Sequence, residues 1–143
     1  MTGMAILQPV VALTIWTLIM WAWMYATRIP AMKAAQIDPD ALARDPDMSL
    51  DRLLPPDVQW KAHNFNHLHE APTVFYAMAI VLALTGTGDG LNLWLGWAYA
   101  ALRVMHSLVQ AIWNKVVLRF ALFTLSTLVL AALVLHAAIA VFH

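Results

Sequence analysis

Four long stretches of almost uncharged residues constrain the fold of this chain more than any other feature of its sequence. A helix needs about 20 mainly apolar residues to cross the hydrocarbon core of a bilayer. Stretches of that kind occupy residues 4–27, 59–84, 91–114 and 120–142. Only 11% of the residues are charged, against roughly a quarter in a typical soluble domain. The sequence therefore predicts an all-α integral membrane protein over residues 1–143, a single domain whose protomer is a four-helix bundle.

The distribution of lysine and arginine predicts how these spans are oriented. Both residues occur between the first two spans and in the link between the last two, but not in the N-terminus, the turn at 85–90 or the C-terminal tail. Because loops rich in lysine and arginine stay in the cytoplasm, we expect residues 28–58 to form a cytoplasmic loop and both termini to lie outside. The first apolar stretch is too long for a signal peptide and lacks a basic residue ahead of it, so we expect a retained span.

A cluster of polar residues, HNFNHLHE at 63–70, lies in the first half of the otherwise apolar span 59–84. Each residue of a helix advances about 100°, so His63, Asn66 and His67 lie within about 60° of Glu70. The third span places a set of polar residues on one similar arc, namely Tyr99, Arg103, His106, Ser107, Gln110 and Asn114. Each of these spans is therefore predicted to carry one polar stripe toward its cytoplasmic half.

Glu70 and Arg103 are the charges placed deepest in the predicted spans. Each lies about ten residues from the cytoplasmic end of its span, or roughly 15 Å at about 1.5 Å per residue. A charge at the bilayer centre costs about 2.5–3.5 kcal/mol even on a lenient scale, so we expect these two side chains to be partners. They either hold two helices together or belong to a polar cavity, and the convergence of several polar groups favours the cavity.

Three segments resemble the bacterial branch of the MAPEG family, the membrane-associated proteins in eicosanoid and glutathione metabolism. The segments are NHLHEAPTVFY, LRVMHSLVQ and NKVVLRF, and the strongest element is Arg103 and His106 followed, thirteen residues after the histidine, by Arg119. The resemblance covers the last three spans closely and the first loosely. It implies a homotrimer in the bacterial inner membrane, with glutathione as cosubstrate bound between protomers near the cytoplasmic side.

Carried over position by position, the resemblance implies a set of glutathione contacts and one residue that activates the thiol. The implied contacts are Arg28, His63, Asn66, Glu70, Arg103, His106 and Gln110, and the implied catalytic residue is Arg119. Two places remain open. The first is the basic position of the family that lies upstream of the asparagine, which matches His63 or Lys61. The second arises because the family commonly spaces its asparagine and acidic residue by three, whereas Asn66 and Glu70 are four apart. His67 or His69 is therefore an alternative for one of these two places.

Two positions depart from the family pattern and bear on activity. Gln110 stands where the family has a tyrosine, and Phe120 where some members have a serine. Arg119 could still stabilise a thiolate, since a neighbouring cation lowers the pKa of a thiol. The expected function is therefore that of a glutathione-dependent transferase or peroxidase acting on lipophilic small molecules. The missing hydroxyls leave open a non-catalytic, lipid-binding or scaffold protein of the same architecture.

A haem or metal protein is a weaker alternative, based on the spacing of His63, His67 and Glu70 and on a facing His106. The chain lacks a second helix rich in histidine or carboxylate, so no metal is expected. It contains no cysteine, so any reactive sulfur must come from a ligand. Its formal net charge is zero, which gives no indication of a nucleic-acid partner.

Overall fold

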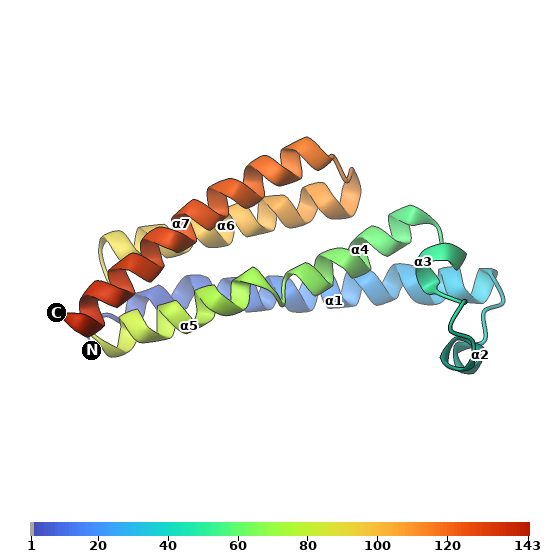
Figure 1. The fold of residues 1–143 in the computed structure, drawn as a ribbon, viewed down its shortest axis with the longest axis horizontal. Helices are drawn as coiled ribbons and strands as arrows, with labels where there is room; N and C mark the ends of the chain where they lie inside the picture. Colours follow the sequence, from blue (N-terminus) through green and yellow to red (C-terminus); the bar gives the residue numbers. More distant parts are fainter. Residues whose placement is uncertain (1) are drawn as a thin grey trace.

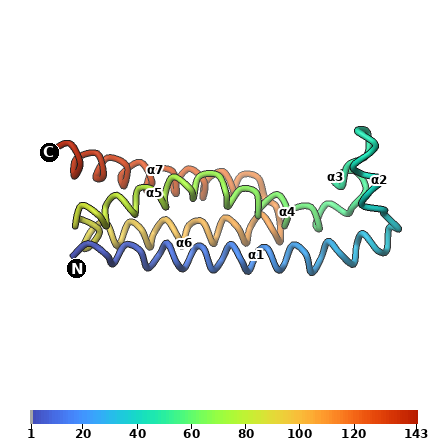
Figure 2. The backbone as a smooth tube through the Cα atoms, turned by 90° about the horizontal axis from the view of Figure 1, so that it is seen from below, coloured from blue at the N-terminus to red at the C-terminus, as the bar shows by residue number. Residues whose placement is uncertain are grey.

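The computed structural model describes residues 2–143, and all regular elements in that range are helical. In chain order they are η1 (Met4–Ile6), α1 (Leu7–Ala34), α2 (Pro39–Arg44), α3 (Leu50–Leu53), α4 (Pro56–His67), α5 (Ala71–Leu84), α6 (Leu91–Ile112) and α7 (Val116–Phe142). Helix α1 runs beside α4 and α5, while α6 and α7 form a second pair that packs against the first (Figure 1). Both termini lie at one end of the molecule, and α2 and α3 lie at the other (Figure 2).

Three helical segments have the length and composition of membrane spans: Met4–Ala34, Pro56–Leu84 and Val116–Phe142. Large apolar side chains on their outer faces are exposed, among them Leu18 on α1 and Leu128 and Leu135 on α7. In water such a surface would be costly, whereas against lipid tails it is favourable. These helices agree with the predicted integral membrane character.

Helix α6 has 22 residues and is not among these three segments, and its polar residues Arg103, His106 and Gln110 are buried in the protein. It contacts α1, α4 and α7, and it buries Tyr99 and Arg103 together with small residues such as Gly96 and Ala100. The close approach at Gly96 is needed for packing, since a Cβ there would lie 3.0 Å from the Pro9 ring of α1. Helix α6 is thus the central helix of the fold and buries the most polar side chains.

The second predicted span, residues 59–84, is interrupted instead of continuous. Helix α4 ends at His67 and α5 begins at Ala71, with Pro72 in the first turn of α5. Proline lacks the N–H that would bond to the carbonyl four residues earlier, and its ring clashes with that carbonyl. At the break the His67 carbonyl accepts the Glu70 N–H at 3.2 Å, and it also accepts a hydrogen bond from α6. Glu70 itself has a ψ of −101°, outside helical geometry.

The end that carries both termini is fixed by Asp89. Its carboxylate accepts hydrogen bonds from the backbone N–H groups of Gly3, at 2.6 Å, and Ala5, at 3.3 Å. Gly3 has a φ of +87°, and a Cβ there would lie 2.6 Å from the backbone of Gly86. The chain start is therefore packed tightly onto the predicted turn at 85–90.

Candidate functional site

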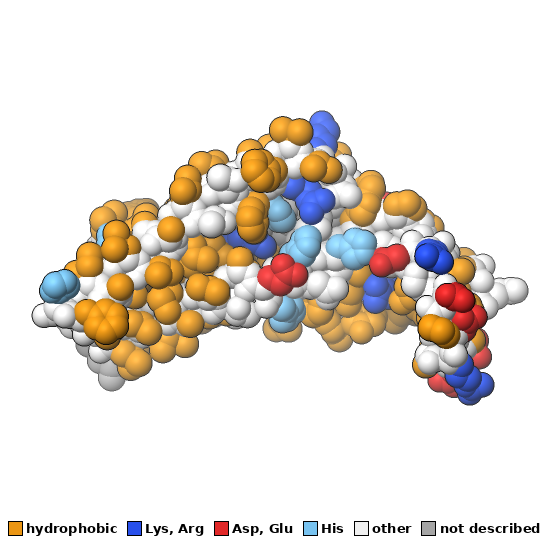
Figure 3. Space-filling model, in the orientation of Figure 1, with side chains coloured by type: hydrophobic (Ala, Val, Ile, Leu, Met, Phe, Trp, Pro, Cys, Tyr) orange, Lys and Arg blue, Asp and Glu red, His pale blue; other side chains and the backbone are white. Residues whose placement is uncertain are grey.

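A cavity of about 260 Å³ lies between the α4–α5 pair and the α6–α7 pair. Its lining residues come from both pairs and are His67, Glu70, Ala71, Arg103, His106, Val116, Arg119, Phe120 and Phe123. In the space-filling view, several charged and histidine side chains lie around a hollow at the middle of the molecule, and a second charged group lies at the α2–α3 end (Figure 3). The cavity therefore combines a cationic and histidine-rich side with an apolar one.

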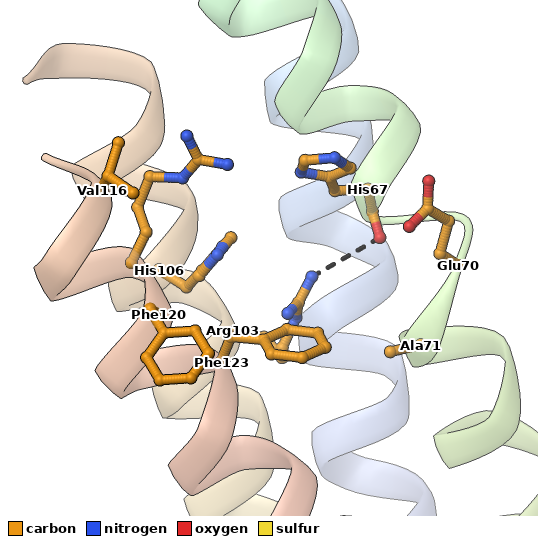
Figure 4. Close-up of a pocket in the computed structure, with 9 residues that line it drawn as sticks. His67, Glu70, Ala71, Arg103, His106, Val116, Phe120 and Phe123 are labelled. Carbon is orange, nitrogen blue, oxygen red and sulfur yellow. Dashed lines mark hydrogen bonds between the residues drawn. The ribbon is translucent and has the colours of Figure 1, made fainter. Parts of the chain in front are cut away.

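Arg103 is the most deeply buried charge, with only 2% of its surface exposed. Its Nη2 donates to the His67 carbonyl at 3.5 Å, across the break between α4 and α5 (Figure 4). Its Nε and Nη1 have no hydrogen-bond partner within residues 2–143. A buried guanidinium has five N–H donors to satisfy, so this cation has unused capacity for an anion.

The predicted ion pair between Glu70 and Arg103 is wrong for this structure. Among the described residues the two side chains form no salt bridge, and Glu70 is exposed. Glu70 lies at the break, as the residue that precedes α5, so it does not continue the helical phase of α4. The backbone carbonyl of His67 takes the place expected for the carboxylate, although Glu70 still lines the cavity.

Two histidines face the cavity from opposite helices. The Nδ1 of His67 lies 3.0 Å from the side-chain oxygen of Gln110, which fixes the ring beside α6. His106 is buried at 4% exposure, and its Nδ1 has no partner within residues 2–143. Asn66 is exposed and does not line the cavity, so the structure brings His67, and not Asn66, to the site three residues before Glu70.

Arg119 enters the site from the first turn of α7. Its Nη1 donates to the side-chain oxygen of Asn114 at 2.5 Å, in the link between α6 and α7. Phe120 and Phe123, on the same helix, supply the apolar side of the cavity. A guanidinium therefore lies next to an apolar wall in the same cavity.

Arg28 and His63 belong to a separate cluster nearer the α2–α3 end. The carboxylate of Asp51 accepts hydrogen bonds from Gln59 Nε2 at 2.5 Å and from His63 Nε2 at 2.8 Å. Arg28 donates to the Gln59 side-chain oxygen at 3.4 Å. The hydrogen bond from His63, followed by that from Gln59, holds the pKa of Asp51 below its ordinary value. Neither of these two predicted contact residues lines the cavity.

The structure also shows polar contacts that the sequence patterns did not predict. The Ser107 hydroxyl accepts a hydrogen bond from Trp16 Nε1 at 2.9 Å and another from Asn64 Nδ2, which joins α1, α4 and α6. Asn64 is fully buried, on the face of α4 opposite the exposed Asn66.

The sequence did contain a signal for the break between α4 and α5. This signal is Pro72, since an internal proline ends or kinks a helix.

The fold and cavity define a class: a helical membrane protein with a cavity lined by cations and histidines and placed among apolar helices. The model of the MAPEG family matches residues 6–139, so the chain belongs to the MAPEG family. Neither the curated proteins nor the solved structures gave a match. Among residues 2–143, no group of three or more His, Asp or Glu side chains is arranged to hold a metal ion.

Proposed function

We propose that this protein binds glutathione at the cavity and uses its thiolate to attack lipophilic electrophiles or peroxides. The observation that carries the proposal is Arg103, a guanidinium that is 2% exposed and has two nitrogen atoms without partners. An isolated buried charge is costly and is normally paired. A carboxylate of the tripeptide would supply the missing acceptor, and membership of the MAPEG family makes glutathione the first ligand to test.

The proposed chemistry requires a thiolate, and Arg119 is the residue suited to stabilise it. Its guanidinium lines the cavity beside Phe120 and Phe123. A neighbouring cation favours the charged form of a thiol. In a transferase reaction the thiolate sulfur would form a bond to an electrophilic carbon. The displaced electron pair would depart with a leaving group, or would move to an electron-withdrawing atom of the substrate, which would then take up a proton.

The lipophilic partner would enter from the bilayer. Three of the four apolar residues that line the cavity, Val116, Phe120 and Phe123, are on α7, whose outer face is exposed and apolar. A molecule dissolved in the lipid could therefore reach the sulfur without crossing an aqueous layer. Membrane lipid and a lipophilic small molecule are accordingly the proposed partners beside glutathione.

A homotrimer would complete the site. The cavity of one protomer, about 260 Å³, falls just below the roughly 300–1,000 Å³ typical of small-molecule sites. Arg28 and His63 lie outside it and would have to come from a neighbouring protomer to contact the same ligand. Cross-linking in lipid nanodiscs that yields trimers would support this assembly, whereas monomers that bind glutathione fully would contradict it.

For orientation we propose a bacterial inner membrane with the loop at 28–58 in the cytoplasm and both termini outside, from the lysine and arginine distribution. The chain lacks cysteine, so single cysteines can be introduced without background labelling. A cysteine in the 28–58 loop should react only from the cytoplasm, and one in the 85–90 turn only from outside. The opposite labelling pattern would reverse the proposed topology.

The thiolate mechanism is tested with two substitutions of Arg119. Arg119→Lys retains the positive charge and should keep part of the ultraviolet absorbance of bound thiolate, while Arg119→Leu should abolish it. Arg52→Leu, at an exposed position of α3, is the matched control and should leave the signal unchanged. Thiolate absorbance that survives in Arg119→Leu would remove Arg119 from the mechanism.

The second candidate function is a non-catalytic, lipid-binding protein of the same family. It is favoured by Phe120 and Gln110, which offer no hydroxyl near the proposed sulfur. Glutathione that binds without forming thiolate in the wild-type protein would support this alternative against the enzyme.

A further inference from the structure

Asn114 has a backbone conformation that few residues adopt. It follows α6 with a φ of +50°, and its N–H donates to the Val109 carbonyl at 2.7 Å to close the helix end. Such left-handed conformations are available at low cost to glycine and, among residues with side chains, mainly to asparagine and aspartate. The backbone alone would therefore be served equally well by glycine.

The side chain of Asn114 has a second contact that glycine could not make. Its Oδ1 accepts a hydrogen bond of 2.5 Å from Nη1 of Arg119. Arg119 is partly buried, and its Nε has no partner within residues 2–143. The contact to Asn114 is therefore what holds this guanidinium in place among the described residues.

Arg119 needs such an acceptor because of where it lies. It is in the first turn of α7, which begins at Val116. The N-terminus of a helix carries partial positive charge, so a cation there is disfavoured. Without an acceptor in the link, the long side chain would be free to turn away from the helix end toward the membrane surface.

We infer that Asn114 is a positioning residue that holds the Arg119 guanidinium at the cavity, an inference that rests on the proposed function. Asparagine meets both requirements at this position. Glycine would keep the left-handed turn but lose the acceptor. Aspartate would keep an acceptor but add a negative charge, which would offset the field of Arg119 at a bound thiolate.

The test compares Asn114→Gly and Asn114→Asp with the wild-type protein by titrating the thiol of bound glutathione through its ultraviolet absorbance. Asn114→Gly should fold normally and bind glutathione within about threefold of wild type, yet raise the pKa of the bound thiol by roughly half a unit or more. That shift corresponds to about threefold less thiolate near neutral pH. Asn114→Asp should also raise this pKa, because it pairs Arg119 with a charge.

A purely structural role for Asn114 makes a different forecast. The left-handed turn would then be all that matters, so Asn114→Gly would behave like the wild type in the thiol titration, and this result would overturn the inference. A wild-type protein that binds no glutathione would instead contradict the proposed function itself.

A measurement without glutathione keeps the positioning claim testable in that case. In protein with ¹⁵N-labelled arginine, the Arg119 side-chain resonance, assigned through Arg119→Lys, should show hindered rotation of the guanidinium. Asn114→Gly should let the guanidinium rotate faster, and Asn114→Asp, which again offers an acceptor, should keep the rotation hindered. An unchanged Arg119 resonance in Asn114→Gly would refute the positioning role.

Discussion

Replacing Arg103 by methionine should stabilise the protein in the absence of ligand. The guanidinium is 2% exposed, its Nε and Nη1 have no partner within residues 2–143, and its contact to the His67 carbonyl is 3.5 Å long. That distance is beyond the usual range of a good hydrogen bond. The carbonyl also accepts from the Glu70 N–H at 3.2 Å, so it keeps a partner in the variant.

The expected change in the free energy of unfolding follows from two opposing contributions. An arginine at the centre of a membrane helix costs about 2.5–3.5 kcal/mol on the lenient insertion scale. Methionine replaces the aliphatic part of the side chain, and such a volume-conserving exchange costs up to about 1.5 kcal/mol in packing. The difference predicts that Arg103→Met raises the free energy of unfolding by roughly 1–2 kcal/mol.

Chemical unfolding in detergent, followed by tryptophan fluorescence, measures this difference. Arg44→Met, at an exposed position of α2, is the control and should change stability by less than about 0.5 kcal/mol. Saturating glutathione should stabilise the wild-type protein and not Arg103→Met, because only the wild type has the cation that binds it.

The opposite result would refute the reasoning. A loss of about 3–5 kcal/mol in Arg103→Met is what a broken buried ion pair produces. A strong coupling between Arg103→Met and Glu70→Gln in a double-mutant cycle would show that the two charges meet after all.

Two further predictions concern other contacts. Ser107→Ala should destabilise the protein by about 1–3 kcal/mol in the same unfolding assay, because it leaves the donors of Asn64 and Trp16 without their acceptor; an unchanged stability would mean that water replaces the hydroxyl. The ionised carboxylate of Asp51, on α3, accepts a hydrogen bond from His63 of α4, which lowers the pKa of Asp51. This contact should therefore hold α3 against α4 at any pH above the ordinary aspartate pKa, and it should weaken as the pH falls through the lowered pKa. Hydrogen exchange of α3 should rise at that acid pH in the wild type, and in Asp51→Asn it should already be fast at neutral pH; equal exchange in both proteins would contradict this.

The polar face of α6 could be predicted from the sequence because the helix is continuous. Helical periodicity placed six residues on one arc, and five of them are buried in α6: Tyr99, Arg103, His106, Ser107 and Gln110. The sixth, Asn114, lies beyond the end of α6 and is half-buried. A regular rotation per residue holds over the whole of an uninterrupted helix, so a count from one residue predicts its neighbours.

The same count failed across the break between α4 and α5. Periodicity grouped Asn66 and Glu70 on one face, but Glu70, which follows the end of α4, lines the cavity and Asn66 does not. The break at 68–70, just before Pro72, ends the helical phase, so angles counted from α4 across these residues have no meaning. The expected pairing of Glu70 with Arg103 depended on that phase, and it failed for the same reason.

Contacts between distant residues could not be predicted from periodicity at all. Ser107 bonds to Trp16 across 91 positions and to Asn64 across 43. A pattern predicts which face of a helix is buried, but the partner of each polar group depends on how the helices pack. Asn114 and Arg119 are only five positions apart, yet their contact depends on the left-handed turn between α6 and α7.

A calorimetric titration of the purified protein with glutathione tests the proposed binding site most directly. The wild-type protein should bind with a dissociation constant at or below the millimolar range, about −4 kcal/mol or stronger. Arg103→Leu should weaken that binding, while Arg44→Leu, at an exposed position of α2, should bind as the wild type does. No measurable binding by the wild-type protein, or equal binding by Arg103→Leu, would contradict a glutathione site at the buried guanidinium.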